Sequence, residues 1–233
     1  GGLIANGTAT EAICATDPSA DQLHKVRVQY GIETTSDNPE AVSNADTIVL
    51  AVKPQVMADV TKGIALVAQD KSPLIISVAA GIREPDLRRW LGYDASIVRT
   101  MPNTPALVQC GATALYANEF VDAESRSMAE TLMQAVGICE WVDHEELLDA
   151  VTAVSGSGPA YCFLLMELMT ETGKKMGLSE ELAMRLSQQT VLGAATMASQ
   201  SADSPATLRR NVTSPGGTTE RALEIFSEGG IDT

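Results

Sequence analysis

The chain has 233 residues, 45% of them hydrophobic, which is enough to bury the core of one large or two modest domains. Its formal net charge of −14 excludes the basic excess that binding to a nucleic-acid backbone requires. The four cysteines form no CxxC or His/Cys cluster, so neither a zinc site nor a disulfide framework is expected, and a reducing cytosol is favoured. No segment resembles a signal peptide or a membrane span, and we expect a cytoplasmic protein.

The first part of the chain alternates between strand and helix patterns. Strands are predicted at residues 12–16, 47–52, 74–78, 96–100, 111–117 and 138–142, with helices between most of them. Residues 47–52 are apolar on both faces, as is typical of parallel strands covered by helices. This alternation predicts an α/β domain with a Rossmann-like, mainly parallel sheet, which we place at residues 1–145.

Only helical patterns follow, which predicts an all-α domain at residues 146–233. Within it, the small-residue run from Ser155 to Gly158 precedes Pro159, a residue that suits the first position of a helix. Residues 160–166 are apolar without a break, and such a helix must be enclosed. We therefore expect a central helix shared with a second subunit, whose start can receive an anion. A glycine-rich linker before an ordinary core helix is the alternative.

Four predicted strands end in turns that could line one crevice, because ligands of a doubly wound sheet lie beyond the carboxyl ends of its strands. The turns are Asp17-Pro18-Ser19, Lys53-Pro54, 79–81 and 101–105. Asp17 fits the acidic position that binds the ribose of a dinucleotide, and its charge favours NADH, whereas Ser19 and Lys53 leave NADPH open. Against a nucleotide site, the G-x-G-x-x-G fingerprint is absent from this sequence, and Asp-Pro-Ser is also an ordinary turn.

Residues 213–219 are a second candidate site. Two glycines and neighbouring hydroxyls just before a helix can hold a carboxylate or phosphate without a lysine; a proline-glycine turn with a threonine cap is the alternative.

His24 and His144 have no partner at catalytic spacing and are expected to be structural. Glu145 either stabilises a helix start or faces the crevice. Because nucleophilic and metal chemistry lack candidates, we expect a cofactor to carry the reaction.

Several motifs resemble the pyrroline-5-carboxylate reductase family: AVKP at 51–54, AAG at 79–81, MPNTP at 101–105, DAVTAVSGSGPAY at 149–161 and TSPGGTT at 213–219. They occur in the family's order and spacing over essentially the whole chain, and SGSGPAY with TSPGGTT is the most specific pair. The resemblance implies NAD(P)H-dependent reduction of 1-pyrroline-5-carboxylate to L-proline, the last step of proline biosynthesis. It also implies a Rossmann domain followed by a helical domain that interlocks in a homodimer, often within a larger ring.

The resemblance also implies site residues. Those expected to contact the cofactor are Asp17, Ser19, Asn38, Val52, Lys53, Pro54, Ala79, Ala80, Gly81, Met101, Pro102 and Asn103. Those expected to bind the substrate are Glu145, Ser157, Gly158, Ser214, Gly216, Gly217, Thr218 and Thr219, the loop at 214–219 coming from the partner subunit. The family's first strand and glycine turn are missing ahead of Gly1, and its last helices are missing after Thr233. A non-catalytic dimeric scaffold, or another imine or 2-hydroxyacid reductase, remains an alternative.

Overall fold

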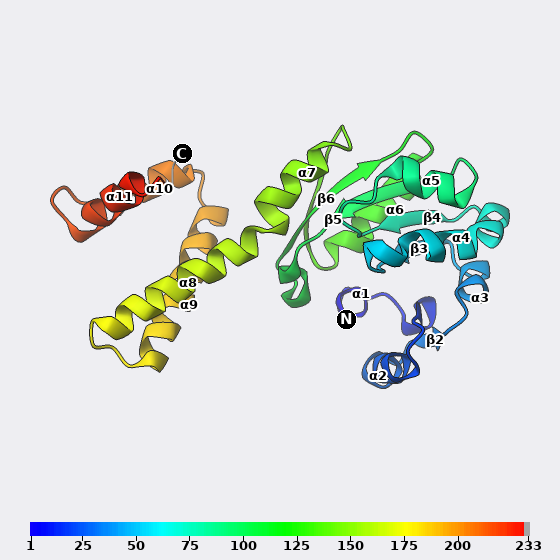
Figure 1. Cartoon of the computed structure of the whole chain (residues 1–233), viewed down its shortest axis with the longest axis horizontal. Helices are drawn as coiled ribbons and strands as arrows, with labels where there is room; N and C mark the ends of the chain where they lie inside the picture. The colour runs from blue at the N-terminus through cyan, green and yellow to red at the C-terminus, as the bar shows by residue number, and fades with distance from the viewer. Residues whose placement is uncertain (231–233) are drawn as a thin grey trace. The chain divides into compact units, whose positions relative to one another are not determined.

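The computed structural model describes residues 1–230 and divides into two compact units, Gly1–Pro159 and a second that starts at Ala160 (Figure 1). The sequence places the domain boundary at 145/146, fourteen residues earlier. The structural reason is that helix α7 (Leu147–Val151) packs on strands β5 and β6 of the first unit, where Leu148 is buried. Residues 146–159 are therefore part of the compact body that contains the sheet.

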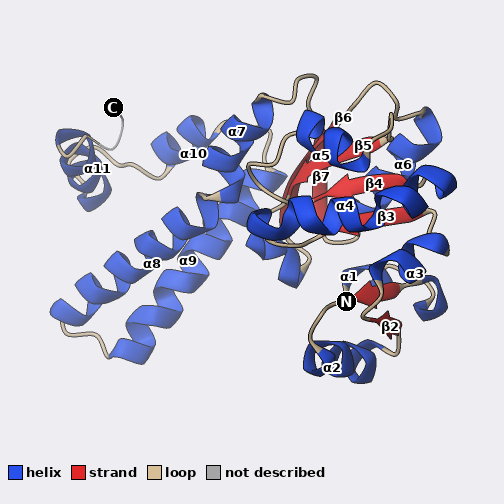
Figure 2. Cartoon of the chain, turned by 45° about the vertical axis from the view of Figure 1, so that its right-hand side comes forward, coloured by secondary structure: helices blue, strands red, loops and turns tan. Residues whose placement is uncertain are grey.

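The first unit is organised around a five-stranded sheet with the order β3-β4-β5-β6-β7, drawn in red in Figure 2. Its strands are β3 (Thr47–Leu50), β4 (Leu74–Ser77), β5 (Ile97–Met101), β6 (Gly111–Ala117) and β7 (Gly137–Trp141). Strands β3 to β5 are parallel, β6 is antiparallel to β5, and β7 is parallel to β6. The predicted mainly parallel sheet is confirmed. The reversal at β6 arises because the β5–β6 connection, built on the short helix η2 (Thr104–Val108), is too short for a parallel crossover.

Helices cover both faces of this sheet. Alternate residues of each strand point to opposite faces, so Ile75 packs toward one helix layer and Ile76 toward the other. One layer consists of α4 (Pro54–Lys71) and α5 (Glu84–Leu91), and the other is α6 (Ala123–Gln134). The best-buried residues of the two faces are Met57, Ile64, Ile75, Leu87 and Ile97 on the first, and Ile76, Val98, Leu115 and Ala129 on the second.

Helix α4 follows directly from its sequence. Pro54 occupies the first turn, where its missing N–H costs nothing. Met57, Thr61, Ile64 and Ala68 then recur every three or four residues and are all buried, which is the spacing of one helix face. The helix ends where Ser72 adopts φ 52°.

The first 43 residues form a smaller layer of their own. It contains α1 (Gly2–Ala5), η1 (Thr10–Ala12), β1 (Cys14–Thr16), α2 (Ala20–Tyr30), β2 (Glu33–Thr35) and α3 (Asn38–Ser43). Strands β1 and β2 pair in parallel as a separate two-stranded sheet, so the strand predicted at 12–16 does not join the main sheet. Helix α3 is capped by Asp37, whose carboxylate accepts from the Glu40 N–H at 2.9 Å. Asn38 is the first residue of this helix.

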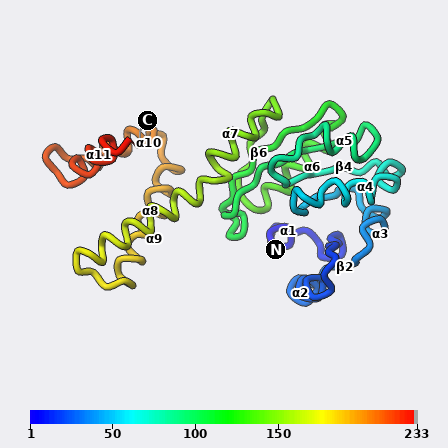
Figure 3. Tube along the Cα trace, viewed as in Figure 1, coloured from blue at the N-terminus to red at the C-terminus, as the bar shows by residue number. Residues whose placement is uncertain are grey.

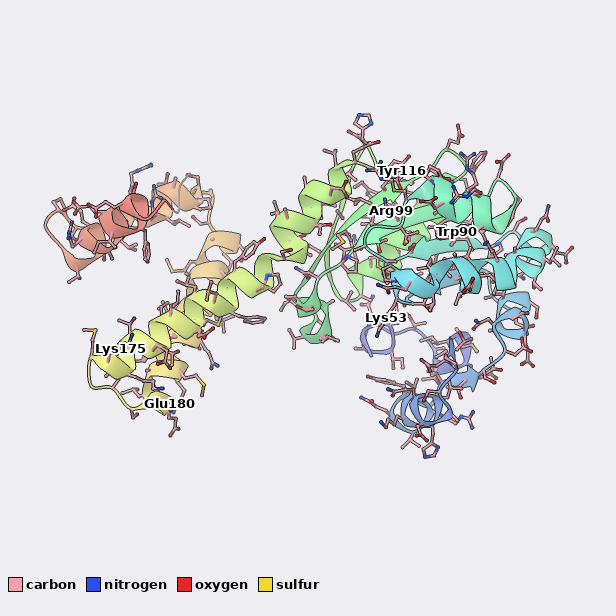
Figure 4. All side chains as sticks on the ribbon, viewed as in Figure 1. Lys53, Trp90, Arg99, Tyr116, Lys175 and Glu180 are labelled. Atoms are coloured by element: carbon pink, nitrogen blue, oxygen red, sulfur yellow. The ribbon has the colours of Figure 1, made fainter. Side chains whose placement is uncertain are left out.

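The second unit consists of helices, coloured from yellow to red in Figure 3. They are the continuation of α8 (Gly158–Lys175), α9 (Glu180–Gln200), α10 (Pro205–Asn211) and α11 (Thr218–Glu228). Helices α8 and α9 lie side by side, joined by a turn near Lys175 and Glu180 (Figure 4), where a Cβ on Gly173 would be 3.1 Å from that of Ala183. Ser179 and Ser204 cap α9 and α10. Within residues 1–230, no helix is long and apolar enough to cross a membrane.

Candidate functional site

The predicted cofactor loops meet at one edge of the main sheet. Because β3, β4 and β5 are parallel neighbours, the segments that follow them come together: 52–54 after β3, 79–81 after β4 and 102–103 after β5, whose last residue is Met101. Gly81 has φ +77°, and a Cβ added there would meet nothing within 4 Å, so this turn leaves open space above the sheet. This is the edge at which doubly wound sheets bind ligands.

The start of α4 is suited to an anionic group. The N-cap residue Lys53 is exposed and its side chain makes no capping hydrogen bond, while the Val56 N–H donates to the Lys53 carbonyl over 3.1 Å. Figure 4 shows Lys53 at this helix start. A helix N-terminus without a side-chain cap, beside an ammonium group, fits a phosphate of a dinucleotide.

Asp17, Ser19 and Asn38 lie with the smaller β1–β2 sheet. The Ser19 N–H donates to Asp17 Oδ1 over 2.7 Å, and Ser19 Oγ accepts from the Gln22 N–H at the start of α2. These groups therefore form an Asx turn and a helix cap, as the alternative interpretation of Asp-Pro-Ser has it. Helix α3, which begins at Asn38, contacts both β1 and α4 and so links the two layers.

The SGSG segment joins two helical elements: Ser155 and Gly156 end a π turn, and Gly158 begins α8. Helix α7 continues through a π-helical turn, η3 (Thr152–Gly156), into α8, and the Ser157 N–H donates to the Thr152 carbonyl over 2.8 Å. Ser157 forms a bend between the π turn and α8, and α8 begins at Gly158, so Pro159 lies in its first turn, one residue from the first helical position that the sequence predicts. Ser157 and Gly158 lie at the junction of this turn with α8.

Asn103 connects this π turn to the loop after β5. Its Nδ2 donates to the Ser155 carbonyl over 3.1 Å, and its Oδ1 accepts from the Ala112 N–H over 2.9 Å. A Cβ on Gly156 would be 2.6 Å from Met101 Cε, so Met101 also contacts the π turn. The structure thus brings Met101 and Asn103 together with the small-residue segment.

Glu145 is held inside the first unit. Its Oε1 accepts from Arg99 Nη1 at 2.6 Å and from the Glu84 N–H at 2.6 Å. The side chains of Arg99 and Glu145 are 7% and 11% exposed, which makes this a buried ion pair. These contacts favour a structural role for Glu145, and its assignment to the substrate stays a prediction.

The 214–219 segment belongs to the second unit: residues 214–217 precede α11, and Thr218 and Thr219 are its first two residues. Gly216 has φ +71°, and its N–H donates to Glu220 Oε2 over 2.7 Å. The Gly217 N–H donates to the Ser214 carbonyl, which closes the turn. Within residues 1–230 the Thr218 and Thr219 hydroxyls make no hydrogen bond, and Gly217 caps α11 without a side chain. The loop therefore presents hydroxyl and first-turn N–H donors, with one carboxylate of its own already bound.

Where the structure shifts the pKa of a side chain within residues 1–230, the pKa moves further from neutral pH. Burial raises the pKa of the Tyr116 phenol, with repulsion from Glu145 next in importance, and burial likewise raises the pKa of Tyr93. Burial also raises the pKa of the Cys139 thiol to about 11. These groups hold one protonation state near neutral pH. Within residues 1–230, no cluster of three or more His, Cys, Asp or Glu side chains is arranged to hold a metal ion.

A hollow of about 510 Å³ lies beside these loops, at the starts of β6 and β7. Because both strands are antiparallel to β5, their starts lie at the edge where β5 ends. The lining residues are Asn6, Gln109, Cys110, Gly111, Ala112, Gln134, Ala135, Gly137 and Ile138. The candidate cofactor residues do not line it, although Ala112 is hydrogen-bonded to Asn103.

Comparison with known proteins identifies the family. A family model described as pyrroline-5-carboxylate reductase dimerisation matches residues 145–233, and one described as NADP oxidoreductase, coenzyme F420-dependent, matches residues 1–81. The curated pyrroline-5-carboxylate reductase of Pseudomonas aeruginosa is 51% identical over 232 residues, which cover 100% of this chain and 85% of that protein. The chain belongs to the pyrroline-5-carboxylate reductase family.

Solved pyrroline-5-carboxylate reductases share its fold throughout. The enzyme from Coxiella burnetii superposes with a TM-score of 0.93 at 45% identity, covering 99% of this chain and 86% of the other. A pyrroline carboxylate reductase from Plasmodium falciparum, solved with NADP bound, gives a TM-score of 0.88 at 31% identity over 99% and 84% of the two chains. These findings confirm the resemblance and the predicted succession of a Rossmann-like domain and a helical dimerisation domain.

Arg99 and Glu220 escape the sequence analysis. No local sequence pattern reveals the partner of Arg99. A capping pattern could have revealed Glu220, because it is an acidic residue in the first turn of α11. Pro159 carried a further signal: a proline inside a helix leaves the carbonyl four residues earlier without its usual donor. That carbonyl is Ser155 O, which Asn103 binds.

Proposed function

We propose that this chain reduces 1-pyrroline-5-carboxylate to L-proline with NAD(P)H, the last step of proline biosynthesis. The observation that carries the proposal is 51% identity to a curated pyrroline-5-carboxylate reductase across the whole of this chain. The TM-score of 0.93 to a solved member of the family supports it. The enzyme is an oxidoreductase that acts on a carbon–nitrogen double bond.

We propose that the cofactor lies along the carboxyl edge of β3, β4 and β5. The uncapped start of α4 and the Lys53 ammonium would hold phosphate, and the open turn at Gly81 would admit the backbone of the ligand. Asp17 near the adenosine ribose would favour NADH, whereas the Plasmodium relative holds NADP, so both cofactors are to be tested. The nicotinamide would lie against residues 101–103 and the π turn.

The chemistry of the reaction fits a site without a buried base. The substrate is a cyclic imine; once protonated on nitrogen, it needs only a hydride at the imine carbon, and the electron pair of the double bond moves to nitrogen. A bound nicotinamide supplies that hydride. This chain's residues would supply orientation and charge complementarity.

We propose that the 214–219 loop of the partner subunit binds the substrate carboxylate. The free hydroxyls of Thr218 and Thr219 and the first-turn N–H groups of α11 support this assignment. Ser157 and Gly158 would border the ring of the substrate.

We further propose that the chain forms a homodimer through its helical domain. On α8 the exposed fractions of Tyr161, Phe163 and Leu168 are 59%, 61% and 56%, and Leu186, Leu192 and Met197 on α9 are more than half exposed. So large an apolar surface is typical of a protein–protein interface. The match to a dimerisation domain at 145–233 supports the proposal. We also propose that the dimers assemble into a ring.

We propose a cytoplasmic location as well. The cysteines of the described residues are free thiols, which is typical of a reducing compartment.

The dimer is tested by sedimentation of Leu168→Glu. A charge in a buried interface should convert the protein to monomers at micromolar concentration. The matched control is Leu66→Glu on α4, where Leu66 is 84% exposed in the first unit and the mass should not change. A Leu168→Glu protein of unchanged mass would exclude this face of α8 from the interface.

The reaction is tested by oxidation of NADH and of NADPH, in parallel, with 1-pyrroline-5-carboxylate as acceptor. Turnover that yields L-proline is the expected result. Cofactor binding without turnover of this acceptor would favour another imine or 2-hydroxyacid reductase. A folded dimer that binds neither cofactor would favour the non-catalytic scaffold.

A further inference from the structure

Asn103 lies where three segments of the first unit meet. It is the N-cap residue of η2, directly after β5, and its amide reaches both the start of β6 and the π turn. Asn103 is partly buried, so its two side-chain hydrogen bonds are shielded from water. A single planar amide therefore fixes the distance between residues 101–105 and residues 152–158.

Pro159 explains why the Ser155 carbonyl is available to Asn103. In an α-helix this carbonyl would accept from the N–H of residue 159, which proline does not have. The π turn instead pairs the Ser157 N–H with the Thr152 carbonyl, and the Ser155 carbonyl is left to an outside donor. Asn103 Nδ2 fills that position at 3.1 Å. The sequence thus creates an orphan acceptor in the helix and supplies its donor 52 residues earlier in the chain.

We propose that Asn103 is a positioning residue for hydride transfer. Its amide sets the π turn against the loop after β5, and so sets the substrate-side segment at a fixed distance from the cofactor-side segment. The inference rests on the proposed placement of nicotinamide and substrate against these two segments. Asn103 acts through the Ser155 carbonyl, and contact with either ligand is not required of it.

The structure separates this role from general stabilisation of the sheet. Ser96 offers a matched case, because its Oγ donates to the Phe120 carbonyl over 2.7 Å and is also partly buried. Ser96 precedes β5 and so lies at the opposite edge of the sheet from Asn103. Loss of either bond removes one side-chain donor to a main-chain carbonyl, but only the Asn103 bond reaches the proposed site.

The test compares Asn103→Asp and Asn103→Ala with Ser96→Ala. Asn103→Asp keeps an acceptor for the Ala112 N–H and loses the donor to Ser155, whereas Asn103→Ala loses both. Both Asn103 variants should lower kcat about tenfold to hundredfold, the effect of a misplacement of about 1 Å. The deuterium isotope effect on kcat, with the cofactor deuterated at the transferred position, should rise in both variants. Ser96→Ala should keep the kcat and isotope effect of the parent protein.

Hydrogen exchange gives a second readout that does not depend on turnover. The amides of residues 152–158 should exchange at least about tenfold faster in both Asn103 variants, because the π turn loses its anchor. In Ser96→Ala these amides should exchange at the parent rate. Exchange at the parent rate, or an Asn103→Asp protein with the parent kcat, would overturn the proposal. If the Asn103 variants exchange faster but the parent protein shows no turnover, the anchoring role of Asn103 is supported and the proposed reaction is contradicted.

Discussion

Arg99 Nη1 lies 2.6 Å from Glu145 Oε1, and this buried ion pair connects the centre of the sheet to the segment that leads into the π turn. Arg99 is in β5, two residues before Met101, and Glu145 precedes α7. The same Glu145 oxygen accepts from the Glu84 N–H at the start of α5, and Arg83 adds an exposed ion pair with Asp149. The first turn of α5, β5 and the entry to α7 are thus joined at one carboxylate.

Removal of Arg99 should be costly. Arg99→Met leaves the Glu145 carboxylate buried without its cation, and we expect the free energy of unfolding to fall by about 3–5 kcal/mol. Urea unfolding followed by tryptophan fluorescence measures this change in the first unit, because both tryptophans, Trp90 and Trp141, lie there.

The double variant Arg99→Met/Glu145→Gln separates lost charge pairing from lost packing. The glutamine side chain introduced at position 145 is neutral but still accepts from the Glu84 N–H, so it should restore a large part of the stability lost in Arg99→Met. A double variant no more stable than Arg99→Met would mean that packing of the arginine stem carries the effect.

Gly137→Ala should weaken the pairing of β6 and β7. Gly137 has φ +152°, and an added Cβ would overlap the Gly111 carbonyl of the neighbouring strand. The backbone conformation alone accounts for about 1–3 kcal/mol of destabilisation, and the overlap adds to it. Thermal unfolding of Gly137→Ala and of Gly63→Ala makes the comparison.

Gly63 is the matched control because it lies within α4 and a Cβ there would meet nothing within 4 Å. Gly63→Ala should raise the stability by about 0.5–1 kcal/mol, since alanine loses less backbone entropy in a helix. Equal effects of the two substitutions would contradict the close approach of β6 and β7.

Local patterns predict much of this fold. Runs such as Leu74–Ser77 are apolar on both faces, and α4 has a single buried stripe, so strand and helix could be assigned from spacing alone. The Thr213–Thr219 loop was recognisable because its glycines and hydroxyls are adjacent in the sequence. Features that depend on distant partners were not: the separate β1–β2 sheet, the antiparallel β6 and the Arg99–Glu145 pair, whose members are 46 residues apart.

The π turn shows a second limit of sequence reasoning. Glycine and serine at 155–158 predict a loop, and proline at 159 predicts a helix start. The helix start is found at Gly158, next to Pro159, but Ser155 and Gly156 belong to a π turn, and the Asn103 amide binds the Ser155 carbonyl that proline leaves unpaired. Tertiary contacts decided the conformation where the local signals were ambiguous.

Thr218→Val/Thr219→Val should weaken substrate binding and leave cofactor binding intact. The two hydroxyls are exposed at the start of α11, and each hydrogen bond to a carboxylate contributes about 1.5–3 kcal/mol. We expect KM for 1-pyrroline-5-carboxylate to rise at least about tenfold, with the cofactor Kd unchanged.

Thr196→Val is the control for this pair, because the Thr196 hydroxyl already donates to the Leu192 carbonyl inside α9. Its KM should match the parent. An unchanged KM in the Thr218/Thr219 double variant would remove these hydroxyls from the carboxylate site.

Glu220→Gln should increase the affinity for the substrate. The Glu220 carboxylate occupies the Gly216 N–H at 2.7 Å, and so places a negative charge in the loop that we assign to a second carboxylate. Two such charges about 4 Å apart in water repel each other by about 1 kcal/mol. The amide oxygen of the introduced glutamine can still accept from the Gly216 N–H, so the loop keeps its conformation while the repulsion is removed.

The measurement is KM for 1-pyrroline-5-carboxylate and Ki for L-proline at low and high salt, in Glu220→Gln and in Glu224→Gln. Glu224 lies one turn further along α11 and pairs with Arg221 at 2.8 Å, so its substitution removes the same charge from the same helix without touching the loop. We expect both constants to fall about twofold to fivefold in Glu220→Gln alone, with a smaller difference at high salt. A rise in KM instead would mean that Glu220 orders the loop for the substrate, and that its charge is needed there rather than opposed to binding.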